Sequence, residues 1–274
     1  STCITPWEAR TAPMKPELAT ILLILQQSLS KHLRISNGYD AKRGQYPYIV
    51  ALCANSTSQV QRLCSGSLIS STWGITAGHC LTYFTRRIRY GDMTVPPLDD
   101  RAQYSHIRRQ IRHPDYTHKR MSALQNLQIQ VKNDIGLMFV APVNLNRYGS
   151  VSAADYSCFM GYRVNYAGFG RTFSGKSGVK NLAKKIAADD RRRLQIAEAV
   201  VKKCSGKDAN VFSPFLCAAP KCEVKSSSQQ GDSGSPLIHA GQIVGVLYGG
   251  KSYESYFTPV SVYIDWIARV MEPS

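Results

Sequence analysis

The chain has 274 residues, 43% of them hydrophobic, enough to bury a large core in one long domain or in two halves. Its net charge of +16 argues for an acidic partner or a polyanionic surface, and a solvated basic face that aids solubility explains it equally well. No helix-turn-helix, zinc-finger or RNA-binding signature accompanies the basic residues, so nucleic acid is not an expected partner. Eight cysteines exceed the usual number in a cytosolic chain of this size and suggest an oxidising compartment.

Residues 1–34 differ in character from the rest of the chain. Met14-Lys15 precedes the apolar run Leu18–Leu25, which is the order of a secretory signal and is too short to span a bilayer. Ser28-Leu29-Ser30 offers small residues for cleavage. The alternative is a pro-segment in which Leu18–Leu29 forms a short helix packed on the body. We favour the signal, which predicts a secreted, extracellular protein with no stable membrane anchor.

From Tyr46 onward the chain is expected to form short β-strands. Runs such as Tyr48–Leu52 and Trp73–Thr76 are separated by Gly, Ser and Asn, a pattern typical of an all-β barrel. The charged stretch 176–203 admits either a helix or a loop followed by a strand. Val262–Val270 has apolar residues at helical spacing, which predicts a helix packed on the core.

Three separate motifs carry side chains of complementary chemistry. His79 stands next to a cysteine, Asp134 precedes an apolar run, and Ser233 lies between small residues. A serine hydroxyl needs a base to take its proton, and that base needs an acid to fix its tautomer and stabilise its charged form. The chain order His79, Asp134, Ser233 is one of the known orders of such a triad. The turn at Ser233 can also direct the amides of Gly231 and Ser233 at one point, as an oxyanion hole requires.

These motifs resemble those of the trypsin/chymotrypsin-like serine proteases, over Ile35 to Met271. The resemblance implies an all-β, chymotrypsin-like fold of two packed antiparallel six-stranded β-barrels with a C-terminal α-helix. It implies that residues 1–34 are a signal-like and activation segment, that 35–145 form the first barrel half, and that 146–274 form the second half with the helix. It also implies a hydrolase of polypeptide substrates without a cofactor, and no group of residues has metal-binding spacing.

The resemblance assigns roles to the three motif residues and their neighbours. Ser233 would attack the peptide carbonyl, His79 would act as general base and then acid, and Asp134 would orient His79. The amides of Gly231 and Ser233 would form the oxyanion hole. Thr117–Lys132 is longer than in most relatives, and we interpret it as a surface insertion beside the active-site cleft.

Arg34-Ile35 resembles the activation site of this family. Cleavage after Arg34 by an activating protease would free the amine of Ile35, which could fold inward and pair with Asp232. Because a buried carboxylate needs a cation, the new terminus is the natural partner. The alternative is an exposed basic loop followed by a strand.

The cysteines follow the family pattern only in part. By the resemblance, Cys64 pairs with Cys80 and Cys204 pairs with Cys217. Gln229 and His239 stand where the family has further cysteines, so two common disulfides are expected to be absent. The cysteines that remain unassigned are Cys3, Cys53, Cys158 and Cys222.

The resemblance places Ser227, six residues before the nucleophile, at the base of the specificity pocket. A serine makes a neutral floor and implies a chymotrypsin- or elastase-like preference, whereas an aspartate would select Lys or Arg. Gly249 and Gly250 would leave the pocket walls open to a bulky apolar side chain. Glu254 would invert this preference if its charge lay inside the pocket.

Two hypotheses of function from different classes follow. The first is a secreted serine endopeptidase made as a zymogen and activated by cleavage after Arg34. The alternative is a protease-like binding protein with weak or no activity that engages sulfated glycans or other polyanions through its basic surface. The two properties are compatible, and a protease that also binds polyanions accounts for both the motifs and the charge.

Overall fold

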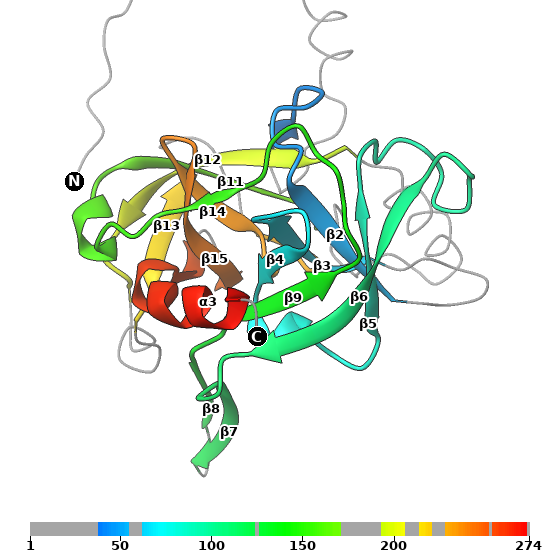
Figure 1. The fold of residues 1–274 in the computed structure, drawn as a ribbon. Coiled ribbons are helices and arrows are strands. Elements are labelled where there is room, and N and C mark those ends of the chain that lie inside the picture. Colours follow the sequence, from blue (N-terminus) through cyan, green and yellow to red (C-terminus); the bar gives the residue numbers. More distant parts are fainter. Residues whose placement is uncertain are drawn as a thin grey trace, which may run out of the picture. The chain divides into compact units, whose positions relative to one another are not determined.

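This computed structural model describes residues 38–54, 62–123, 126–170, 193–205, 214–220, 228–251 and 254–272. The predicted signal and activation segment, with Arg34 and Ile35, lies outside these residues, and so does Ser227. Strands dominate the described part (Figure 1). None of its helices is both long enough and apolar enough to span a membrane.

Six strands of the N-terminal half close into an antiparallel barrel in the order β2-β3-β4-β9-β6-β5. They are β2 (Ile49–Ala54), β3 (Arg62–Leu68), β4 (Trp73–Thr76), β5 (Thr85–Tyr90), β6 (Gln103–Arg112) and β9 (Gly136–Val140). Side chains that point inward from these strands form a buried core, as period-2 patterning requires. Its fully buried members include Leu52, Leu68, Ile75, Ile88 and Leu137.

Six strands of the C-terminal half form the second ring, β12-β11-β14-β15-β16-β13, which the β12–β13 pairing closes. They are β11 (Arg163–Gly168), β12 (Gln195–Lys202), β13 (Leu216–Pro220), β14 (Pro236–His239), β15 (Gln242–Lys251) and β16 (Glu254–Pro259). Two short strands extend the sheet, β1 (Tyr39–Asp40) against β12 and β10 (Ser150–Val151) parallel to β15. The predicted fold of two six-stranded barrels is thus confirmed. The domain limits at residues 34/35 and 145/146 stay a prediction.

The C-terminal helix is also confirmed. A 3-10 turn, η5 (Ser261–Tyr263), leads into α3 (Ile264–Met271), so the helix begins two residues later than the apolar spacing predicts. Its Ile267 is buried, and Trp266 packs against the imidazole of His113 with ring centroids 5.0 Å apart. Two other 3-10 turns are η1 (Gly78–Cys80) and η2 (Tyr156–Phe159).

The stretch interpreted as a surface insertion, 117–132, and the stretch left open between helix and strand, 176–203, both contain strands. Within 117–132, β7 (Thr117–Ala123) pairs antiparallel with β8 (Asn126–Lys132), and the two strands project from the barrel body (Figure 1). In 176–203, residues 195–202 form β12, as expected for a loop followed by a strand, while 176–192 lie outside the described residues.

Candidate active site

His79 and Asp134 are brought together from two segments of the first barrel. His79 lies in η1 directly after β4, and Asp134 lies just before β9, the strand that pairs with β4. The Nδ1 atom of His79 lies 2.6 Å from Oδ2 of Asp134, and the backbone N–H of His79 donates to Oδ1 at 2.8 Å. Since an ionised carboxylate only accepts, this geometry requires the proton on Nδ1 and leaves Nε2 for proton transfer.

Asp134 is 1% exposed, and the chain around it is shaped to bury it. Asn133 has a left-handed backbone with φ of 51°, which Asn tolerates better than most residues. The side chain of Asn133 donates to the carbonyl of Asp115 at 3.0 Å and accepts from the Tyr263 hydroxyl at 2.9 Å. The carbonyl of Asp134 accepts from the Thr258 hydroxyl of the second barrel at 3.2 Å. Both barrels therefore hold the acidic residue in place.

Tyrosine hydroxyls near Asp134 stay protonated. Burial raises the pKa of Tyr116 and of Tyr263 to about 12, and the negative charge of Asp134 adds to both shifts. Burial, then Asp134, also raises the pKa of Tyr248. Because Asp134 is buried, little water screens its charge from these tyrosines.

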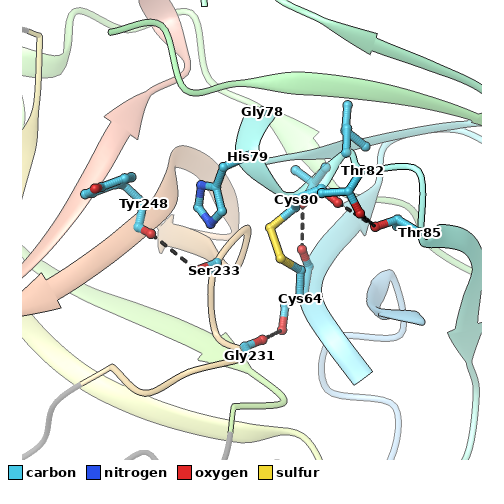
Figure 2. Close-up of a disulfide and its surroundings, with 12 residues drawn as sticks. Cys64, Gly78, His79, Cys80, Thr82, Thr85, Gly231, Ser233 and Tyr248 are labelled. Carbon is cyan, nitrogen blue, oxygen red and sulfur yellow. Dashed lines mark hydrogen bonds between the residues drawn. A yellow bond between two sulfur atoms is a disulfide. The ribbon is translucent and has the colours of Figure 1, made fainter. Parts of the chain in front are cut away.

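Ser233 comes from the second barrel, in the turn before β14. Its hydroxyl donates to the carbonyl of Tyr248 at 3.3 Å, and the ring of His79 meets the ring of Tyr248 edge to face, with centroids 5.7 Å apart. Figure 2 shows the His79 ring directed toward the Ser233 turn. Transfer of the hydroxyl proton to His79 therefore requires the hydroxyl to rotate away from the Tyr248 carbonyl.

The turn that carries Ser233 presents two backbone amides. The N–H of Asp232 donates to the carbonyl of Gln229 at 3.0 Å, which closes a four-residue turn with Gly231 in third position. Gly231 has a φ of 98°, the positive value that a type II turn demands there. Among the described residues, the amides of Gly231 and Ser233 donate to no protein acceptor. Both are therefore available to a ligand oxygen.

The carboxylate of Asp232 is fully buried, at 0% exposed, next to this turn. It accepts from the amide of Gly170 at 2.6 Å and from the amide of Gln229 at 2.8 Å. A Cβ on Gly170 would lie 2.2 Å from the carboxyl carbon of Asp232, so only glycine fits at this position.

The described part of the predicted specificity pocket is lined by small neutral groups. The hydroxyl of Ser255 donates to the hydroxyl of Ser228 at 3.2 Å. A Cβ on Gly250 would lie 2.4 Å from the Ser228 hydroxyl, whereas one on Gly249 would meet nothing within 4 Å. The wall is thus open at Gly249, while Gly250 packs closely against Ser228.

Glu254 lies beside this region, but its charge points away from it. Residues alternate across a strand, so Glu254 and Tyr256 face the side of β16 opposite Ser255. The carboxylate accepts from the Ser205 hydroxyl at 2.6 Å and the Tyr256 hydroxyl at 3.1 Å, and pairs with Lys202 at 3.2 Å. Glu254 therefore supplies no charge to the wall formed by Ser228 and Ser255.

The structure contains the disulfides Cys64–Cys80 and Cys204–Cys217, the two pairs implied by the resemblance. The first ties η1, with His79, to β3 (Figure 2). Ligand-type atoms of Cys64, His79 and Cys80 lie within 4.8 Å of one another, but sulfurs joined in a disulfide are not thiolate ligands. This group of three residues is therefore not suited to a metal.

Asn133 belongs to the motif of Asp134, and Tyr248 ends a strand that the sequence predicts beside the substrate pocket, but no sequence signal points to Thr258. The contacts of all three residues join segments far apart in the chain. Gly170 does carry a sequence signal, because paired glycines such as those of Gly168-Phe169-Gly170 often mark a place where another group approaches the backbone closely. In the structure, that group is the carboxylate of Asp232.

Comparison with known proteins is consistent with this geometry. The family model described as Trypsin matches residues 35–267. Putative trypsin-6 of Homo sapiens is 29% identical over 245 residues, covering 85% of this chain and 88% of that protein. Anionic trypsin of Canis lupus familiaris is 28% identical over 242 residues, with coverages of 85% and 88%. Neuropsin, a serine protease from mouse brain, covers 86% of this chain and 99% of its own structure, with a TM-score of 0.63 and 21% identity, a likeness of fold.

Glu254 generates a prediction about stability and pH. Burial opposes its ionisation, but hydrogen bonds from Ser205, Lys202 and Tyr256 outweigh burial and hold the pKa of the carboxyl below its usual value. A carboxyl with a lowered folded pKa adds stability above its unfolded pKa, and that contribution is lost as the pH falls through the folded pKa. In chemical denaturation, Glu254→Gln should therefore be less stable than the parent at neutral pH, with the gap closing as the pH falls through the lowered pKa of the Glu254 carboxyl.

Glu272→Gln removes an exposed carboxyl and controls for the loss of one negative charge. A stability gap for Glu254→Gln that stays constant with pH, or that matches the control, would contradict this account.

Proposed function

This chain belongs to the trypsin family of serine-type endopeptidases, and we propose that Ser233, His79 and Asp134 form its catalytic triad. The observation that carries the proposal is the double contact of Asp134 with the imidazole and the amide of His79, at 2.6 and 2.8 Å, beside a turn with two unused amides. Asp134 and the residues around it fix the tautomer and orientation that a general base needs.

The mechanism follows from these positions. The Ser233 oxygen attacks the peptide carbonyl carbon while its proton passes to Nε2 of His79, whose Nδ1 proton stays bonded to Asp134. The carbonyl oxygen becomes negative and is held by the amides of Gly231 and Ser233. His79 then protonates the departing amine, leaving an acyl group on Ser233. Water, deprotonated by His79, releases this acyl group and restores the enzyme.

We propose that the protein is secreted as a zymogen and activated by a protease that cuts after Arg34. The support is the position of Asp232, a fully buried carboxylate directly before Ser233 that accepts from the amides of Gly170 and Gln229. An ammonium from Ile35 would stabilise that negative charge and, with it, the adjacent turn. The charge-then-apolar order of residues 14–25 supports secretion.

For specificity, we propose a neutral pocket of the chymotrypsin or elastase kind. The hydroxyls of Ser228 and Ser255, the open side at Gly249 and the outward carboxylate of Glu254 support it. Ser227, which lies outside the described residues, would complete the floor as another neutral hydroxyl.

We also propose that the basic surface binds sulfated glycans or other polyanions. A cavity of about 520 Å³ is lined by Lys42, Arg43 and Arg193, by the carboxylate of Asp92 and by apolar side chains. A fourth cation of the lining, Arg101, is paired with Asp99 at 2.7 Å. Because cations outnumber the lining carboxylate, the cavity carries an excess of positive charge, which concentrates oppositely charged ligands. The alternative function, a binding protein with weak or no protease activity, would rest on the same surface.

The catalytic proposal predicts labelling of Ser233 by a fluorophosphonate probe that depends on cleavage at Arg34. The full chain should react after limited tryptic cleavage and only weakly before it, and Arg34→Gln should block the change. Ser233→Ala should never react. Asp134→Asn should fold yet lose about 10⁴-fold in kcat, because the wrong tautomer of His79 is favoured. A folded, cleaved chain that does not react would favour the binding protein instead.

The specificity proposal predicts that peptides with Phe or Ala before the scissile bond are cleaved with higher kcat/KM than the matching Arg peptide. A neutral floor gives Arg no counter-charge, whereas Ser227→Asp supplies one and should shift the preference toward Arg. Higher kcat/KM for Arg in the parent enzyme would refute the neutral pocket.

The polyanion proposal predicts late, salt-dependent elution from a sulfated column, because screened charges release the ligand. The double variant Arg43→Gln/Arg193→Gln should elute at lower salt than Arg108→Gln/Arg109→Gln, which removes two exposed arginines from β6. Elution of the parent no later than a neutral relative would reject polyanion binding. Equal elution of the two double variants would reject the cavity rim as its location.

A further inference from the structure

Ser65 of β3 contacts the Ser233 turn from the opposite barrel, and it is 0% exposed. Its amide donates to the carbonyl of Ser233 at 2.7 Å. Its hydroxyl donates to the carbonyl of Gly231 at 3.0 Å and accepts from the amide of Phe169 at 3.1 Å. Its carbonyl accepts from the Thr76 hydroxyl at 2.7 Å. All the polar groups of Ser65 are therefore engaged, and two of them hold the turn.

These two bonds bracket the peptide that carries the Ser233 amide. Ser65 holds the carbonyl of the Gly231–Asp232 peptide on one side and the carbonyl of the Ser233–Gly234 peptide on the other. The N–H of the first of these peptides is also held, by the carbonyl of Gln229 at 3.0 Å. Because peptide groups are planar, fixing both flanking groups limits the directions in which the Ser233 amide can point.

The turn needs such external support because glycines lie on both sides of the nucleophile. Gly231 and Gly234 have φ values of 98° and 85°, in a region where glycine moves freely and other residues are strained. A Cβ on Gly234 would lie 2.1 Å from the carbonyl oxygen of Ser65, so close packing excludes a stiffer residue. Tertiary contacts must therefore supply the order that the local sequence cannot.

We propose that the Ser65 hydroxyl is a positioning residue that keeps the amides of Gly231 and Ser233 aligned on the oxyanion. The inference rests on the proposed function, since it concerns the same site. An amide that is slightly misdirected still permits substrate binding but stabilises the transition state less, so the effect falls on kcat. Loss of a whole oxyanion donor costs about 10²–10³ in kcat, and misalignment should cost less, about 10- to 100-fold.

Ser67 is a matched control within the same strand. It lies two residues further along β3, on the same face, and is also 0% exposed. Its hydroxyl has no hydrogen-bond partner in the part of the chain that the structure describes. Ser67→Ala thus removes a buried hydroxyl from β3 without touching the turn.

The experiment compares Ser65→Ala, Ser65→Thr and Ser67→Ala with the parent, all as full chains cut at Arg34. End-point labelling with a fluorophosphonate counts folded, reactive sites, so kcat is expressed per labelled site. Ser65→Ala should lose about 10- to 100-fold in kcat with KM nearly unchanged, and should bind a peptide boronate, which forms a tetrahedral adduct, less tightly. Ser67→Ala should match the parent within about twofold, and Ser65→Thr, which keeps the hydroxyl, should recover most of kcat.

Three outcomes would overturn the proposal: an unchanged kcat in Ser65→Ala, an equal loss in Ser67→Ala, or a loss confined to KM. If Ser65→Ala yields no folded protein, Thr76→Val replaces it, because it removes the hydroxyl bound to the Ser65 carbonyl. Unchanged kcat in that variant also overturns the proposal, and reduced kcat with constant KM supports it. An unreactive parent would refute the proposed function itself, which separates the two failures.

Discussion

The contact on which the site depends is that of a buried carboxylate with one histidine. Asp134 binds both the ring and the backbone of His79, so the histidine is fixed in position and in tautomer together. Burying a carboxylate is costly unless hydrogen bonds compensate, and here the compensation comes from the group that the carboxylate must orient. The left-handed backbone of Asn133 and the hydrogen bond from the Thr258 hydroxyl to the Asp134 carbonyl help to hold this carboxylate in its buried position.

The second constraint is close packing between the two barrels around the Ser233 turn. A Cβ on Gly170 would collide with Asp232, and a Cβ on Gly234 would collide with Ser65. Glycine therefore permits the close packing, but it leaves the backbone more flexible than another residue would. Ser65 of the first barrel restrains the flexible turn by donating hydrogen bonds to two of its carbonyls. The same interface therefore limits the motion of the amides of Gly231 and Ser233, which have no acceptor among the described residues.

At two positions where the family commonly has a cysteine, other residues make local contacts instead of a disulfide. Gln229 stands in place of a cysteine, yet its amide binds Asp232 and its carbonyl closes the turn. His239 stands in place of another, and its ring packs against Phe159 and Tyr162 while Nδ1 lies 3.0 Å from the Arg163 carbonyl. Backbone hydrogen bonds and aromatic packing thus hold these segments where the family commonly uses disulfides.

The sequence by itself pointed to the family through its short motifs, to β-strands through its patterning and to the terminal helix through its spacing, because these are local signals. The arrangement in two barrels followed from the resemblance to the family. The sequence left open whether Glu254 charges the pocket wall, and strand alternation with pairing to Lys202 decided that it does not. No sequence signal pointed to Ser65 or Thr258, ordinary polar residues that act through partners distant in the chain. Only the tertiary structure decides such contacts. A hydrogen bond between the barrels depends on how each barrel closes and packs on the other, and no local sequence pattern encodes the distance between its donor and acceptor.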